Sequence, residues 1–192
     1  MINLTVEEKT IIESHAFAQI LSSNIRDSGF AELVYCPLQL MENDSLLGHL
    51  SANNPLIKAA TENSEVKVIF SGPHGYISPR WHKEQIVPTW NYATVSMTCR
   101  LNIVENSDDK LKAMEMISHY FDPQWDFSNF NQAGNTKMVQ QMLAAITVFT
   151  LDMIEVNSKF KLSQNRSIDC RTAFQKNLYL TGYNDLAEIQ LL

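Results

Sequence analysis

The chain has 192 residues, of which 45% are hydrophobic and 19% charged, enough to bury the core of one domain or of one domain with a tail. Its net charge of -6 argues against a large phosphate-binding face, and therefore against direct DNA binding. Cys36, Cys99 and Cys170 are widely spaced and form no CxxC pair, so they predict neither a disulfide framework nor a zinc site. The first residues lack a signal-peptide pattern, and no window reaches the ~18 apolar residues of a membrane span. We therefore expect a cytoplasmic protein.

The first half of the chain predicts one helix and then a run of strands. Thr5, followed by Glu7 and Glu8, has the pattern of a helix N-terminus, and this helix is expected to end near His15. Short alternating or β-branched runs separated by turn residues then predict five or six strands in all. A short helix with Pro55 in its first turn is expected among them. The expected strands cover residues 17–22, 31–41, 46–50, 66–71 and 95–105, and the helix covers 53–62.

Helices are expected again in the second half. Apolar residues at helical spacing predict a helix over 108–121, capped by Ser107 or Asp108. The expected order continues with a loop over 122–135, a helix over 138–145, a buried strand over 146–156 and a last helix over 169–180. Short strands with helices at the ends indicate an α+β protein, mainly β, with a closed or split β-barrel.

Two turn-rich blocks have the composition of binding segments. They are residues 72–90, GPHGYISPRWHKEQIVPTW, and residues 159–166, KFKLSQNR. Each combines aromatic rings, hydroxyls or amides in a short stretch. Such a combination suits a flat ligand with a polar rim, because rings stack on its faces while amides and hydroxyls bind its edge.

Four motifs occur in an order that resembles the PaiB-type FMN-binding split-barrel family. They are HLSANNP from His49, IFSGPHGYISPRW from Ile69, VPTWNY from Val87, and KFKLSQNR from Lys159. The resemblance runs from about residue 15 to residue 166. It implies a split barrel of about six strands with helices at the ends, forming a homodimer with FMN in the grooves between subunits. It also implies an FMN-binding domain over 1–166, with 167–192 as a C-terminal helical tail packed on it.

The chain departs from the family pattern at several positions, and two of these departures bear on the implied groove. Ala52 replaces an arginine of the family's HLARANP-like motif, and Ser96 stands after VPTWNY where the family commonly has histidine. Both changes remove polar or cationic groups from the implied groove. A divergent barrel that has lost FMN is therefore one alternative.

An FMN site must bind a phosphate, stack against a three-ring plane and pair with a polar rim. Arginine, lysine and hydroxyl groups suit the phosphate, tryptophan suits the rings, and amides suit the rim. The cofactor-binding candidates that the resemblance implies are His49, Ser78, Trp81, Thr89, Trp90, Asn91, Lys161, Ser163, Gln164, Asn165 and Arg166. No catalytic residue is assigned, because the flavin supplies the chemistry. No histidine pair has metal-ligand spacing, so no metal is expected.

Simpler interpretations of these residues stay open. Trp90 is either a ligand wall or a core ring of the barrel. Arg166, beside Lys159 and Lys161, is either an anion site or a solvated charge cluster.

Two functions from different classes follow. The first is an FMN-dependent oxidoreductase similar to flavin reductases, with a nicotinamide as electron donor; the chain has no GxGxxG segment, but such barrels need none. The alternative is a PaiB-like transcriptional regulator or flavin sensor that acts without a DNA-binding domain of its own.

Overall fold

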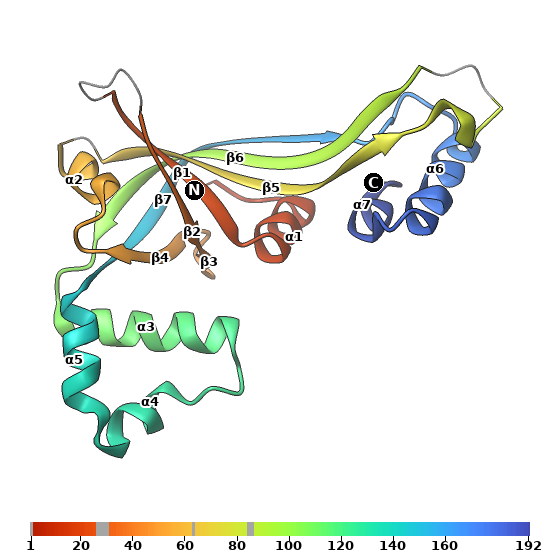
Figure 1. Ribbon diagram of the computed structural model, residues 1–192. Coiled ribbons are helices and arrows are strands. Elements are labelled where there is room, and N and C mark those ends of the chain that lie inside the picture. Colours follow the sequence, from red (N-terminus) through yellow and green to blue (C-terminus); the bar gives the residue numbers. More distant parts are fainter. Residues whose placement is uncertain (1, 26–30, 63, 84–86) are drawn as a thin grey trace.

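The computed structural model describes residues 2–25, 31–62, 64–83 and 87–192 (Figure 1). The elements in chain order are α1 Val6–Ser14, β1 Phe17–Ile25, β2 Ala31–Pro37, β3 Gln39–Leu40, β4 Leu46–Ser51, α2 Pro55–Glu62, β5 Glu65–Ile77, the 3-10 turn η1 Pro79–Trp81, β6 Thr89–Ile103, α3 Ser107–Phe121, α4 Phe127–Phe130, the π-helical η2 Asn131–Asn135, α5 Thr136–Ala144, β7 Ile146–Lys161, α6 Ile168–Leu180 and α7 Asn184–Ile189.

The described strands form one antiparallel sheet in the order β2-β1-β5-β6-β7-β4-β3. The outermost strands, β2 and β3, are separated in the chain by Leu38 alone. The sheet must therefore curl until its two edges approach each other. At the crossing point between them, the Leu38 backbone N–H donates to the Ala16 carbonyl, just before β1, at 2.9 Å. The result is a curled half-barrel of the α+β class, mainly β, which confirms the predicted fold class. The expected strand over 31–41 is divided at Leu38, which adds a seventh strand to the expected set.

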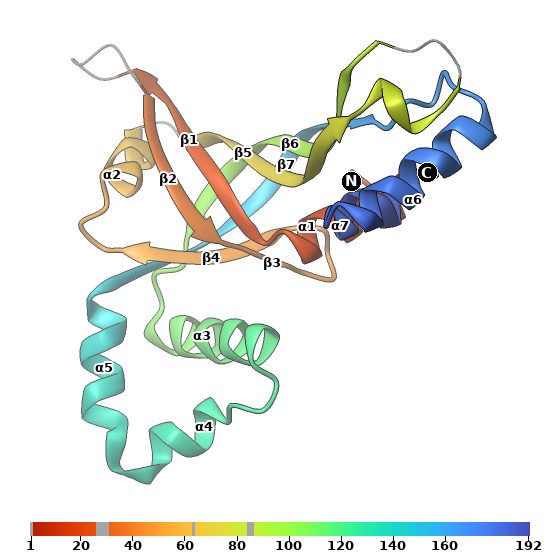
Figure 2. The same ribbon diagram turned by 45° about the vertical axis from the view of Figure 1, so that its right-hand side comes forward.

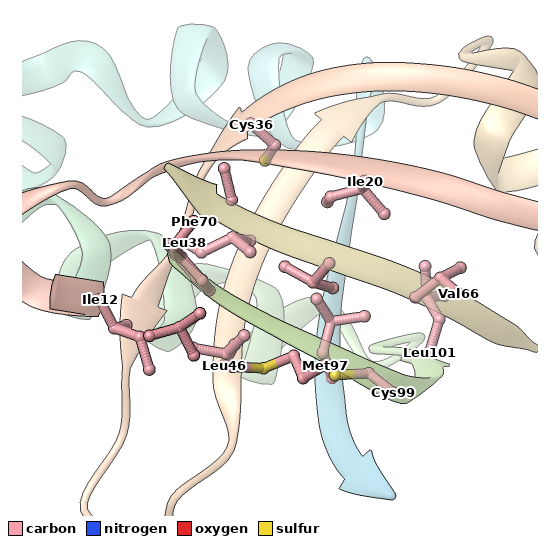
Figure 3. Close-up of a cluster of buried hydrophobic side chains, with 14 of the residues drawn as sticks. Ile12, Ile20, Cys36, Leu38, Leu46, Val66, Phe70, Met97, Cys99 and Leu101 are labelled. Carbon is pink, nitrogen blue, oxygen red and sulfur yellow. The ribbon is translucent and has the colours of Figure 1, made fainter. Parts of the chain in front are cut away.

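Strict alternation along β6 builds the barrel core. Val95, Met97 and Cys99 are fully buried, whereas the residues between them are partly exposed. All three belong to the same buried cluster as Phe70 of β5 and Ile12 of α1. Figure 3 shows Met97 and Cys99 in this cluster with Phe70 and Ile12. The Thr5 side chain accepts from the Glu8 backbone N–H and the Glu8 carboxylate accepts from the Thr5 N–H, so the predicted N-terminus of α1 is confirmed as a capping box.

Beyond the barrel, β5, β6 and β7 continue as a three-stranded arm. Its far end is reached at the pairs Ile77↔Thr89 and Tyr92↔Lys161. Figures 1 and 2 show α6 and α7 at this end, away from α3, α4 and α5, which lie below the barrel. Buried apolar residues from the strands and both helices join there, among them Ile77, Leu162 and Phe174.

The strand expected over 66–71 is too short, because residues 72–77, which belong to the turn-rich block over 72–90, continue β5. The chain passes through a register shift between Ser71 and His74 and stays paired with β6. A Cβ at Gly72 would lie 2.9 Å from the Ala93 carbonyl oxygen and 3.0 Å from Ile11. Glycine is therefore required here for the close approach of β6 and α1, and its presence does not mark a turn.

Three further expectations need correction. Asn106 caps α3, because its side chain accepts from two backbone N–H groups of the first turn. The expected loop over 122–135 contains α4, whose N-cap Asp126 accepts from the Asn129 N–H at 2.8 Å. The strand expected over 146–156 runs on to Lys161, and beyond Leu151 it is largely exposed, with Ile154 43% exposed. Both faces of β7 are therefore covered at the barrel end, where residues 147–149 are all buried, and this cover is lost beyond Leu151. No helix in the described ranges is long and apolar enough to cross a membrane.

Candidate functional site

A pocket of about 260 Å³ opens at the end of the arm, where the strands meet α6. More than half of the predicted cofactor residues meet here. The lining consists of Ile77, Val87, Thr89, Lys161, Ser163, Gln164, Asn165, Arg166 and Phe174. Hydroxyl, amide and cationic groups thus surround an apolar floor made by Ile77 and Phe174.

A tight turn after β7 brings four consecutive polar side chains to this pocket. We call residues 162–166 the 162–166 turn. Leu162 is fully buried and anchors its start. Ser163 has a φ of 60°, in the left-handed region, and the Arg166 N–H donates to the Ser163 carbonyl at 3.0 Å. The Gln164 side chain accepts from the Leu162 N–H and donates to the Phe160 carbonyl, so it maintains the shape of the turn.

Neither cation of the pocket has a carboxylate partner among the described residues. Neither Lys161 nor Arg166 belongs to an ion pair of the described ranges, unlike Lys9, which pairs with Asp44, and Lys112, which pairs with Asp109. Lys161 Nζ instead donates to Thr89 Oγ1 at 2.8 Å. A hydroxyl partner holds the ammonium without neutralising it, so the positive charge remains available to an anion.

Asn91 supports the turn from behind, away from the pocket. Its side chain is fully buried; Oδ1 accepts from Ser163 Oγ at 3.0 Å, and Nδ2 donates to Gln190 Oε1 at 3.0 Å. Ser78 is also buried, and its Oγ accepts from the Arg80 N–H at the start of η1. The structure therefore places these two predicted rim residues behind the lining of the pocket.

The two tryptophans lie in different surroundings. The Trp81 ring packs on Phe174 with centroids 6.5 Å apart, next to the pocket floor. Trp90 is 46% exposed on the arm, where its Nε1–H donates to His74 Nδ1 at 3.2 Å and its ring neighbours Tyr76. Exposure to this degree rules out the alternative that Trp90 is a core ring.

His49 lies apart from the other predicted residues. It belongs to β4 and lines a small apolar pocket of about 90 Å³ with side chains of α3, α4 and α5. Burial lowers the pKa of His49, which favours its neutral form. Ala52 is at the same end, where its N–H donates to the Ala145 carbonyl at 3.0 Å. Neither residue lines the pocket of the 162–166 turn.

A larger cavity, about 430 Å³, is chemically unsuited to a phosphate. It lies between β5 and the loop before α7, and its lining includes His15, His74 and Asp185. No Lys or Arg occurs among the described residues that line it. Burial lowers the pKa of His15, and the nearby Asp185 offsets part of that shift. The smaller pocket at the 162–166 turn is therefore the candidate anion site.

The sequence model of the family described as "Putative FMN-binding domain" matches this chain over residues 5–155. The chain belongs to this FMN-binding family. FMN is accordingly its cofactor, and the predicted relationship to PaiB-type proteins is confirmed. The matched region ends before Lys161, so the 162–166 turn and the tail lie beyond it.

Relatives of this FMN-binding chain include the Protease synthase and sporulation protein PAI 2 of Bacillus subtilis. The two are 25% identical over 159 residues, which cover 81% of this chain and 75% of that protein. An uncharacterized protein of Emericella nidulans is 28% identical over 160 residues, covering 65% of this chain and 62% of the fungal protein.

Solved structures show the same fold at low identity. The FAD and heme binding protein of Mycobacterium smegmatis has a TM-score of 0.63 and 16% identity, over 87% of this chain and 76% of that one. A flavocytochrome of Azotobacter vinelandii has a TM-score of 0.57 and 16% identity, over 79% and 64%. The half-barrel of the FMN-binding family is thus shared with these structures.

Sequence reasoning missed Phe174 and Gln190. Phe174 of α6 forms part of the pocket floor, and Gln190 supports Asn91. Both belong to the tail, where the sequence has helical spacing but no motif that distinguishes a supporting side chain from an ordinary core residue.

Proposed function

We propose that this FMN-binding flavoprotein is an FMN-dependent oxidoreductase similar to flavin reductases, and that the pocket at the 162–166 turn binds the FMN phosphate. The observation that carries the proposal is the presence at one pocket of two cations that have no carboxylate partner among the described residues. Arg166 offers a planar bidentate fork to a phosphate and Lys161 a point charge, while the single hydroxyl proton of Ser163 is donated to Asn91 and shapes the turn that presents them.

The size of the pocket supports a site shared between two subunits. At about 260 Å³ it is smaller than the ~300 Å³ at which clefts for whole ligands begin, so it suits the phosphate end of FMN better than the entire cofactor. The flavin ring must then extend onto another surface. From Met153 to Lys161, β7 pairs with β6 alone among the described strands, which leaves its outer edge open. We therefore include a homodimer with flavin between subunits in the proposal.

Bound FMN supplies the electron-transfer chemistry. In this proposal Lys161 and Arg166 bind the phosphate, Thr89 positions Lys161, and the exposed Trp90 ring beside Thr89 offers a stacking surface. A reduced nicotinamide is the proposed electron donor. A cytoplasmic location belongs to the same proposal, since the cysteines are free thiols, as in a reducing compartment.

The first experiment is a titration of the purified protein with FMN, followed by flavin fluorescence and Trp emission. Riboflavin and FAD are the controls. We expect saturable FMN binding with micromolar affinity or better and much weaker binding of riboflavin, because only FMN has the terminal phosphate. Equal affinities for FMN and riboflavin would contradict a phosphate site at the 162–166 turn. Absence of binding would support the alternative of a barrel that has lost FMN.

A flavin-sensing regulator is the second candidate, and the Bacillus subtilis relative is named for protease synthase and sporulation, with no reaction in its name. Rapid mixing of the FMN-loaded protein with NADH or NADPH separates the two functions. Bleaching of the flavin absorbance within seconds supports the oxidoreductase. A flavin that neither nicotinamide reduces supports the sensor, whose action on genes would need a partner, given the net charge of -6.

A further inference from the structure

We propose that Gln190 is a positioning residue for the 162–166 turn, so that the C-terminal segment sets how tightly the protein binds the phosphate of FMN. This inference rests on the proposed function, since it assumes that the turn binds the phosphate. Gln190 lies far beyond residue 155, where the match to the FMN-binding family ends.

A continuous chain of hydrogen bonds leads from Gln190 to the pocket. Gln190 Oε1 accepts from Asn91 Nδ2 at 3.0 Å, and Asn91 Oδ1 accepts from Ser163 Oγ at 3.0 Å. Gln190 Nε2 also donates to the Leu162 carbonyl at 2.7 Å. Gln190 therefore contacts the 162–166 turn twice, once directly at its first residue and once through Asn91.

Burial makes these contacts difficult to replace. Asn91 and Gln190 are both fully buried, so water cannot take the place of either amide. Ser163 has a φ of 60°, in the left-handed region that L-residues other than glycine rarely adopt. The buried amides hold this residue on both sides, through its hydroxyl and through the preceding carbonyl. The turn is thus kept in an unfavourable backbone conformation by side chains from outside it.

Gln190 is itself fixed by α6. Arg171 Nη2 donates to the Gln190 carbonyl at 2.9 Å and to the Leu192 carbonyl at 2.6 Å. Figure 2 shows α6 and α7 packed together beside the end of the arm. Helix α6, the end of the chain and the turn therefore form one connected unit.

The test compares Gln190→Met with the matched control Gln175→Ala. Gln175 is also a tail glutamine, whose Nε2 donates to the Ala187 carbonyl at 2.9 Å and not, among the described residues, to the 162–166 turn. We expect Gln190→Met to weaken FMN about tenfold, the equivalent of one buried hydrogen bond, and to leave riboflavin within twofold. Gln175→Ala should leave both affinities unchanged. The proposal would be overturned if Gln190→Met lowered the affinities for FMN and riboflavin equally. It would also be overturned if the folded Gln190→Met protein bound FMN as tightly as the wild type.

Hydrogen exchange gives a readout that needs no flavin. Amides of residues 162–166 should exchange faster in Gln190→Met than in Gln175→Ala, whereas those of the barrel strands should not change. If the wild-type protein binds FMN and riboflavin equally, the phosphate site fails, yet faster exchange in the turn would still support the positioning role. Unchanged exchange would refute it.

A second variant covers the case in which Gln190→Met does not fold. Arg171→Met retains both buried amides and removes the two hydrogen bonds that hold the backbone around Gln190. We expect the same direction of change, with FMN weakened about threefold and exchange of the turn accelerated. An Arg171→Met protein with wild-type exchange in residues 162–166 would count against the proposal.

Discussion

Lys161 Nζ lies 2.8 Å from Thr89 Oγ1, so a hydroxyl at the start of β6 fixes the ammonium at the end of β7. The two residues are 72 positions apart in the chain. Their contact connects the two sequence blocks that separately predicted a binding site. It also orients a positive charge at the rim of the pocket without consuming that charge.

Replacing Thr89 with valine tests this orientation at nearly constant side-chain volume. Thr89→Val should weaken FMN by about 0.5 to 1.5 kcal/mol, the net value of one hydrogen bond, because Lys161 loses its partner. Riboflavin should bind as before. Isothermal titration measures both affinities, and Thr94→Val, further along β6, is the control. If Thr89→Val and Thr94→Val lowered the FMN affinity equally, the loss would reflect a general effect on β6.

Arg166→Ala removes the bidentate group of the pocket. We expect FMN affinity to fall by roughly 1.5 to 3 kcal/mol, the scale of a charge-assisted hydrogen bond, with riboflavin unaffected. Lys159→Ala is the matched control, because this exposed cation is in the same sequence block and does not line the pocket. An Arg166→Ala protein that is folded and binds FMN like the wild type would exclude Arg166 from phosphate binding.

Dilution tests whether the site is shared. If flavin lies between subunits, dilution below the dimer dissociation constant should release it, because ligand binding and subunit association are linked. Ile154→Asp, on the exposed half of β7, should shift this release to higher protein concentration. Sedimentation velocity monitored at the flavin absorbance follows both species. A monomer that sediments with bound flavin would disprove the shared site.

The buried thiols predict how stability responds to alkaline pH. Burial raises the pKa of Cys36 to about 11 and that of Cys99 to about 12, from an ordinary value of 9.0. In the unfolded chain these thiols therefore ionise at a lower pH than in the folded protein. The contribution of the two thiols to stability is full below pH 9 and declines as the pH rises towards 11–12. Urea denaturation between pH 8 and 11 should show this decline, with a shallower slope for a Cys36→Ala, Cys99→Ala double variant. An unchanged slope would assign the effect to other groups.

Local pattern predicted most elements of the fold, and pairing between distant segments explains the errors. The capping box at Thr5 and the apolar spacing within α3 depend on neighbours a few residues away, so the sequence alone revealed them. Gly72 was misread because its role is set by Ala93 and Ile11, which reach it only in three dimensions. The same limit concealed the extension of β7 to Lys161, where one face is exposed and the alternation of apolar residues fades.

The sequence motifs indicated the polar residues that line the pocket more clearly than the buried residues that hold them in position. Lys161, Ser163 and Arg166 belong to one recognisable segment, and the structure brings them to one pocket. Asn91 belongs to a motif too, but its burial under the turn depends on Gln190, whose position follows from tail packing. Single-sequence patterns contain no signal for such a pairing.

The position of β7 between β6 and β4 determines when the barrel can form during synthesis. Leu46 of β4 pairs with Leu151, so β4 gains this partner only after the ribosome has added about a hundred further residues; until then its partner among the described strands is the two-residue β3. A fragment ending at Ala145 should accordingly show unprotected amides in residues 48–51, which pair with β7 alone. The strand that completes the barrel ends at Lys161, and the pocket also needs the 162–166 turn and Phe174 of α6, so a nascent chain acquires its core late in translation and its pocket after that.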